Sequence, residues 1–128
     1  MEQEGFVSLW AGKFKSNKDL QDYLSISYTR DGDAIPSKFE TGFGIDYYDE
    51  DFREAEYYDG ELNKLPTLLK GCSYDDIVIP NYIETYGETL KYSVNSLILL
   101  YNFLHSEKVN NHSSHVNYIG SVTYKSLD

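Results

Sequence analysis

The chain lacks the cysteine pairs that disulfides require, the long apolar run that spans a membrane and the excess of basic residues that favours nucleic-acid binding. Its 128 residues include one cysteine, three prolines and 11 lysine or arginine residues against 21 aspartate or glutamate residues. The lone Cys72 cannot form an internal disulfide, so nothing demands an oxidising compartment. No run approaches the roughly 18 apolar residues that span a bilayer, and the first residues lack a signal-peptide pattern. We therefore expect an unexported, cytoplasmic protein without membrane contact.

The formal net charge of −10 is concentrated in the first half of the chain. Residues 1–64 carry a net charge of −8, whereas residues 65–128 carry −2. Such a field repels phosphate groups, because proteins bind nucleic acids mainly through lysine and arginine. We expect no direct binding to DNA, RNA or anionic lipid.

Length and hydrophobic patterning indicate one α+β domain over residues 1–128. A chain of this size buries roughly two-thirds of the surface that it exposes when unfolded. Strand patterns occur at residues 6–14, 96–104 and 116–124, and the middle one is too apolar to face water on either side. We predict a mainly antiparallel sheet in which the N-terminal strand, near its middle, joins the two C-terminal strands, packed with short helices.

Helix and turn signals occur between these strands. Ser16, followed by Asp19, approximates a capping box and predicts a helix over about residues 17–24. Residues 30–33 have the composition of a hairpin turn or exposed loop. Residues 39–58 fit both helix and strand spacing, and we favour a turn near Asp49 followed by a short regular element.

The patterns after residue 60 predict shorter helices and a loop. Leu62, Leu65, Leu68 and Leu69 recur at helical spacing up to Lys70-Gly71, and Pro66 limits that helix to a short one. Pro80 is expected to halt the apolar run before it, with a helix from about residue 82 closed by Gly87. The polar residues 107–114 predict a connecting loop.

The most unusual segment is residues 46–61, which holds eight acidic residues, one base and four tyrosines. It is either a solvated acidic face or a recognition surface. Tyrosine is enriched at interface hot spots, and carboxylates around it accelerate encounter with a basic partner. The candidate partner-binding residues are Asp46, Tyr47, Tyr48, Asp49, Glu50, Asp51, Glu54, Glu56, Tyr57, Tyr58 and Asp59.

A calcium site is the obvious alternative for clustered carboxylates, but the spacing does not fit an EF-hand loop. That loop needs an oxygen ligand at its fifth position and glycine at its sixth. Starting at Asp49, these positions hold Arg53 and Glu54. We predict no metal site there beyond weak, nonspecific cation binding.

Catalytic patterns are missing from the chain. His105, His112 and His115 lack the cysteine partners or the HExxH spacing of a zinc site. Neither a glycine-rich phosphate loop nor a G-x-S-x-G elbow occurs. We predict a binding protein with no enzymatic activity and no cofactor. An acidic interaction module of unrelated role and a small carboxylate-dependent hydrolase are the alternatives.

Five motifs in this order resemble the immunity protein 22 family of bacterial polymorphic toxin systems. They are Ser8-Leu9-Trp10-Ala11-Gly12-Lys13-Phe14, Leu20-Gln21-Asp22-Tyr23-Leu24, Ile35-Pro36-Ser37-Lys38-Phe39, Phe43-Gly44-Ile45-Asp46-Tyr47-Tyr48-Asp49-Glu50-Asp51-Phe52 and Asn95-Ser96-Leu97-Ile98-Leu99-Leu100-Tyr101-Asn102-Phe103. The resemblance is strongest through Phe52 and weakest over residues 60–92.

The resemblance implies a cytosolic antidote that binds and neutralises a cognate toxin. Many such toxins are nucleases with basic clefts, where the carboxylates of an acidic inhibitor could lie in place of phosphates. Within the motifs we expect Trp10, Phe14, Phe39 and Phe52 to pack in the core, and residues 46–51 to contact the partner.

Overall fold

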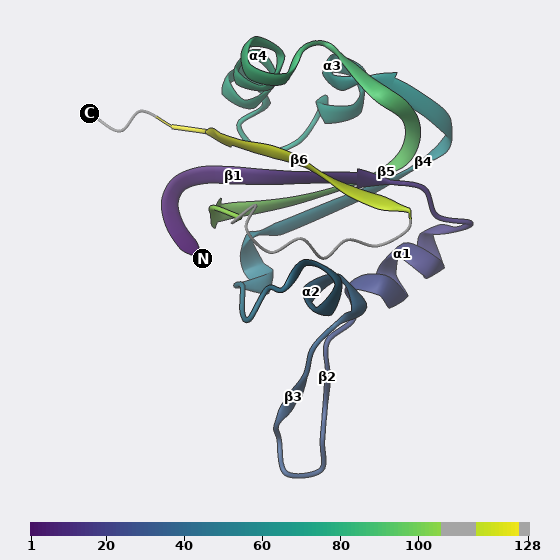
Figure 1. The fold of residues 1–128 in the computed structure, drawn as a ribbon, viewed down its shortest axis with the longest axis vertical. Coiled ribbons are helices and arrows are strands. Elements are labelled where there is room, and N and C mark those ends of the chain that lie inside the picture. The colour runs from purple at the N-terminus through teal and green to yellow at the C-terminus, as the bar shows by residue number, and fades with distance from the viewer. Residues whose placement is uncertain (106–114, 126–128) are drawn as a thin grey trace.

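A four-stranded antiparallel sheet lies between two pairs of helices (Figure 1). The computed structural model describes residues 1–105 and 115–125. Its elements are β1 (Glu2–Gly12), α1 (Asn17–Leu24), β2 (Ser27–Tyr28), β3 (Ala34–Ile35), α2 (Lys38–Phe43), the 3₁₀-helix η1 (Glu50–Phe52), β4 (Arg53–Lys64), α3 (Leu65–Leu69), α4 (Asp75–Tyr86), β5 (Thr89–Phe103) and β6 (Val116–Thr123). The loop predicted over residues 107–114, and His112 with it, lies outside the described residues.

The strand order in this sheet is β4-β5-β1-β6. The N-terminal strand β1 pairs antiparallel with both β5 and β6, which confirms the predicted arrangement. The prediction missed the fourth strand, β4, which pairs antiparallel with β5 at one edge. Every residue of β4 is half-buried or exposed, so its sequence lacks the apolar run that marks an inner strand.

Each face of the sheet has its own hydrophobic core. Val7, Leu9 and Ala11 of β1 pack with α3 and α4, whereas Trp10 packs with α1 and α2 on the opposite face. This division follows from the alternation of side chains along a strand. Trp10, Phe14 and Phe39 are buried, as predicted.

The two helices on the Trp10 face begin at serine caps. Ser16 Oγ accepts a hydrogen bond from the Asp19 amide at 3.2 Å, which confirms the predicted start of α1. The short helix α2 was not predicted, although Ser37 and Glu40 form a capping box there. Gly44 ends α2 in the left-handed conformation, with a φ of 65°.

The prolines affect the helices differently from the prediction. Pro66 lies in the first turn of α3, and Leu62 belongs to β4 rather than to the predicted helix. Pro80 lies inside α4, so the prediction that it halts the preceding apolar run is wrong. The buried Tyr82 joins α4 to the sheet, because its hydroxyl donates to the Gly120 carbonyl oxygen at 2.9 Å. No helix in residues 1–105 or 115–125 is long and apolar enough to cross a membrane.

Strands β2 and β3 form a small hairpin that projects from the body of the molecule (Figure 1). Thr29 donates its amide to the Asp33 carbonyl oxygen at 2.9 Å, and Gly32 has a φ of 87°. The turn predicted over residues 30–33 is thereby confirmed.

Candidate functional site

The predicted binding segment comprises two parts with different backbone structure. Residues 46–52, here called the acidic loop, connect α2 to β4 and include η1. Residues 53–59, here called the acidic strand, form the first part of β4. The two parts are continuous in sequence, but their side chains have different environments.

The acidic loop is held in place by Tyr48 and Arg53. Tyr48 is only 3% exposed and packs edge-on against the Phe39 ring, with 6.0 Å between the ring centroids. Its hydroxyl accepts a hydrogen bond from Arg53 Nη1 at 2.8 Å, and the same nitrogen donates to the Leu24 carbonyl oxygen at 3.3 Å. Burial raises the pKa of Tyr48, an effect that the Arg53 charge opposes. The loop is therefore fixed to the end of α1.

Most of the other side chains of the acidic loop face solvent. Asp46, Glu50 and Asp51 are exposed, and Tyr47 is 64% exposed. Asp49 is half-buried and caps η1, because its Oδ1 accepts a hydrogen bond from the Asp51 amide at 2.9 Å. Carboxylates on a fixed backbone can face a charged partner with little further ordering.

Phe52, at the end of the acidic loop, is 45% exposed, so the prediction that it packs in the core is wrong. It lies in η1, immediately before β4, rather than on the inward face of a regular element. Periodicity gives no information on side-chain direction in a turn of three residues. An aromatic ring is thereby available at the surface beside the carboxylates.

Strand alternation separates the side chains of the acidic strand. Ala55 and Tyr57 pack on the face covered by α1 and α2, whereas Tyr58 packs on the face covered by α3 and α4. Glu54 and Glu56 share the face of Tyr58, where the three residues line a hollow of about 140 Å³ beside Cys72. The structure therefore does not bring Tyr57 and Tyr58 to one surface.

Three polar side chains of the acidic strand have internal partners. The Glu54 carboxylate accepts hydrogen bonds from both the amide of Ser73, at 3.0 Å, and its hydroxyl. The hydroxyl of Tyr57 donates to the Lys15 carbonyl oxygen at 3.3 Å, and that of Tyr58 donates to the carbonyl oxygen of Leu68. These contacts tie β4 to neighbouring segments.

Glu56 and Asp59 are the exposed carboxylates of the acidic strand. No hydrogen bond or ion pair joins either side chain to another part of the described ranges 1–105 and 115–125. They continue the run of exposed carboxylates onto the edge strand β4, where Glu56 lies with Tyr58 on the side covered by α3 and α4.

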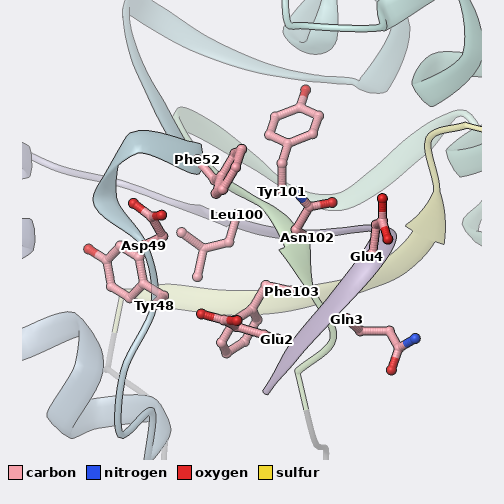
Figure 2. Close-up of a pocket in the computed structure, with 10 residues that line it drawn as sticks. All are labelled: Glu2, Gln3, Glu4, Tyr48, Asp49, Phe52, Leu100, Tyr101, Asn102 and Phe103. Carbon is pink, nitrogen blue, oxygen red and sulfur yellow. The ribbon is translucent and has the colours of Figure 1, made fainter.

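Two carboxylates outside the predicted segment lie beside the acidic loop. Glu2 and Glu4 of β1 line a groove of about 400 Å³ together with Asp49 and Phe52 (Figure 2). Burial lowers the pKa of the Met1 amino group, and the charges of Glu2 and Asp46 oppose that shift. Sequence reasoning missed both glutamates, because only a strand pairing over about 100 residues places the N-terminus here. The one available signal was the acidic start of the chain.

The other candidate groups give little support for catalysis or metal binding. Burial raises the pKa of the Cys72 thiol to about 11, so the nucleophilic thiolate is scarce at neutral pH. Within the described ranges, no three His, Cys, Asp or Glu side chains are grouped to hold a metal ion. His105 is buried two residues beyond the end of β5, and its ring packs against Trp10 and Tyr118.

Comparison with known protein families gives a match over most of the chain. A family profile described as Immunity protein 22 matches residues 7–125, which is nearly the whole chain. Neither curated proteins nor solved structures include a chain with detectable similarity. The matched range contains both the acidic loop and the acidic strand.

Proposed function

Because this chain belongs to the immunity protein 22 family, we propose that it neutralises a cognate toxin by binding a basic surface of that toxin through the acidic loop and the exposed acids of β4. The family supplies the general role in toxin immunity and implies a toxin partner that is bound rather than chemically altered. The surface and the basic character of the partner are our inference.

The observation that carries this proposal is a set of exposed carboxylates on an anchored backbone. Asp46, Glu50 and Asp51 face solvent, whereas Tyr48 and Arg53 hold the loop that bears them. The overall charge of −10 adds a long-range field of the same sign. Such an arrangement accelerates association with a positive partner and disfavours negative ones.

The predicted binding residues take two roles in this proposal. The contacting residues are Asp46, Tyr47, Asp49, Glu50, Asp51, Glu56 and Asp59. The residues that position them are Tyr48, Glu54, Tyr57 and Tyr58, whose polar groups have internal partners. Tyr47 is the tyrosine of the segment best placed to enter a pocket on the partner, because its ring is mostly exposed.

A nuclease with a basic cleft is the toxin class that fits this surface best. Such a cleft binds phosphates through lysine and arginine, and carboxylates on a protein surface can pair with the same side chains. An inhibitor of this kind would block substrate entry stoichiometrically, without chemistry of its own. We infer a cytoplasmic site of action from the composition and the family.

The test is a titration of the toxin domain encoded beside this chain, with toxin activity as the readout. We expect loss of activity near one molar equivalent and an association rate that falls steeply as salt is raised. The triple variant Asp46→Asn, Glu50→Gln, Asp51→Asn should associate roughly tenfold more slowly at low salt.

The matched control is the triple variant Asp76→Asn, Glu84→Gln, Glu88→Gln. These exposed residues lie on α4 and just beyond it, on the opposite face of the sheet, and the variant loses the same net charge. Unchanged toxin activity at several-fold excess of the wild-type chain would refute the proposed function. Equal slowing in both triple variants would refute the proposed surface.

A further inference from the structure

The groove between the acidic loop and the start of β1 originates from a large bulge in β1. Glu2 pairs with Phe103 and Val7 pairs with Tyr101, so four residues of β1 lie opposite the single residue Asn102. The bulged strand therefore curves away from the sheet at its N-terminal end (Figure 1).

Asn102 and Gly5 hold this bulge through unusual backbone conformations. Asn102 has a φ of 57° and Gly5 a φ of 86°, and both values lie in the left-handed region. The side-chain oxygen of Asn102 accepts hydrogen bonds from the Gly5 amide at 3.1 Å and from the Tyr124 hydroxyl at 2.5 Å. The wall of the groove is therefore a hydrogen-bonded part of the folded sheet.

The groove combines an aromatic and aliphatic floor with carboxylates at its rim (Figure 2). Its apolar lining comes mainly from the half-exposed Phe52 and from the outer edges of the buried side chains Tyr48, Leu100 and Phe103. The ring of Tyr101 packs on the opposite face of the sheet. The carboxylates of Asp49 and Glu2 lie on the side of Tyr48, and that of Glu4 lies toward the opposite end (Figure 2).

The carboxylates at the rim differ in their ion pairing. Glu4 Oε1 pairs with Lys125 Nζ at 2.8 Å. No lysine or arginine in the described part of the chain forms an ion pair with Glu2 or Asp49. Glu2 does interact with the charge of the Met1 amino group, and Asp49 Oδ1 accepts a hydrogen bond from the Asp51 amide. Each carboxylate has a second oxygen that can pair with a cation from outside the molecule.

We propose that this groove receives an arginine side chain of the toxin, an inference that rests on the proposed function. A guanidinium group forms paired hydrogen bonds with carboxylates, and its flat face stacks on aromatic rings. Glu2 and Asp49 supply the carboxylates, and the half-exposed ring of Phe52 supplies a stacking surface. The volume of about 400 Å³ lies in the range of pockets that hold small ligands, which leaves room for one guanidinium side chain.

The position of the groove favours a side chain of the toxin over a free small molecule. Asp49 belongs both to the acidic loop and to the groove, so the groove continues the proposed binding surface. A toxin docked on the acidic loop would bring its own basic residues to the groove entrance. The partner chemistry that fits is an arginine flanked by further basic residues.

The test uses NMR titration of the full-length chain with three blocked hexapeptides, of arginine, of lysine and of citrulline, the neutral isostere of arginine. We expect the arginine peptide to shift the amide signals of Phe52 and Asn102, and the other two to bind more weakly. The variant Glu2→Gln, Asp49→Asn should weaken arginine-peptide binding roughly tenfold. Asparagine also caps helices, so Asp49→Asn preserves η1.

The variant Asp46→Asn, Asp51→Asn is the matched control, because it removes the same charge from outside the groove. It should weaken binding by no more than about threefold. Equal weakening by both variants, unshifted Phe52 and Asn102 signals, or equal binding of the lysine peptide would each overturn the arginine assignment. Toxin inhibition by the wild-type chain, measured in parallel, decides the proposed function separately.

Discussion

The acidic loop and the acidic strand have similar compositions but different physical roles. In the loop, Tyr48 anchors the backbone and the carboxylates around it face solvent. In the strand, Glu54, Tyr57 and Tyr58 form hydrogen bonds with distant segments. Part of a composition that suggests recognition therefore serves the internal structure instead. The difference shows that an acidic, tyrosine-rich run cannot be treated as one surface before the backbone is known.

The largest expected effect is a difference in the free energy of unfolding between variants of the two adjacent tyrosines of the acidic loop. Tyr48→Ala should lower the free energy of unfolding by about 3 kcal/mol or more, because it empties a buried aromatic site. Tyr47→Ala should change it by less than about 0.5 kcal/mol, because that ring is mostly exposed. Urea denaturation of both variants measures this contrast. Similar losses in both would contradict the assignment of Tyr48 as the anchor.

The next effect concerns the thiol beneath the acidic strand. Burial raises the pKa of Cys72 from an ordinary value of 9.0 to about 11. Because a raised thiol pKa favours the neutral form, the thiolate population at pH 8 should fall by about 100-fold. Reaction with a disulfide reagent such as DTNB should be slower by a comparable factor in folded than in urea-unfolded protein. The chain has one cysteine, so equal rates would show directly that the thiol is not shielded.

A smaller effect distinguishes contact residues from positioning residues in toxin binding. Tyr47→Ala should weaken binding of the toxin by about 2 kcal/mol, the usual size for a hot-spot tyrosine, without loss of stability. Tyr57→Phe removes only a hydroxyl that donates to Lys15 and should leave affinity nearly unchanged. Isothermal titration calorimetry with each variant provides the comparison. If Tyr47→Ala left the affinity unaltered, Tyr47 would not be part of the interface.

The smallest effect tests the structural role of one carboxylate in the acidic strand. Glu54→Gln should cost about 1 kcal/mol of stability, because it weakens the charged contacts with both the amide and the hydroxyl of Ser73. Glu56→Gln serves as the control, since that side chain is exposed and should tolerate the change. Chemical denaturation monitored by tryptophan fluorescence can resolve the difference. Equal stabilities would mean that the Ser73 contacts contribute nothing measurable.

Much of the fold could be predicted because local patterns dominate it. Alternation along residues 6–14 places Trp10 opposite Val7 and Leu9, and the serine cap at residue 16 marks the start of α1. The apolar run near residue 100 required an inner strand, and β5 is one. These signals depend on neighbouring residues, which a sequence displays directly.

The candidate site could be predicted only in part, because its geometry depends on long-range pairing. The face on which Glu54 or Tyr57 lies is set by the register of β4 against β5. The groove depends on a bulge held by Asn102, whose left-handed backbone is not evident from its neighbours. Glu2 approaches Asp49 only after β1 has joined the sheet, so its contribution could not be read from the sequence.

Among the strands of the described residues, β4 forms an edge of the sheet and pairs with β5. An unpaired edge is a template on which another chain can add a strand and begin aggregation. A second copy that added itself antiparallel to β4 would bring acidic side chains such as Glu56 and Asp59 against their own kind, and like charges in register destabilise a strand pair. The same negative charges that we propose for toxin binding are therefore expected to disfavour pairing of this edge with a second copy of the chain.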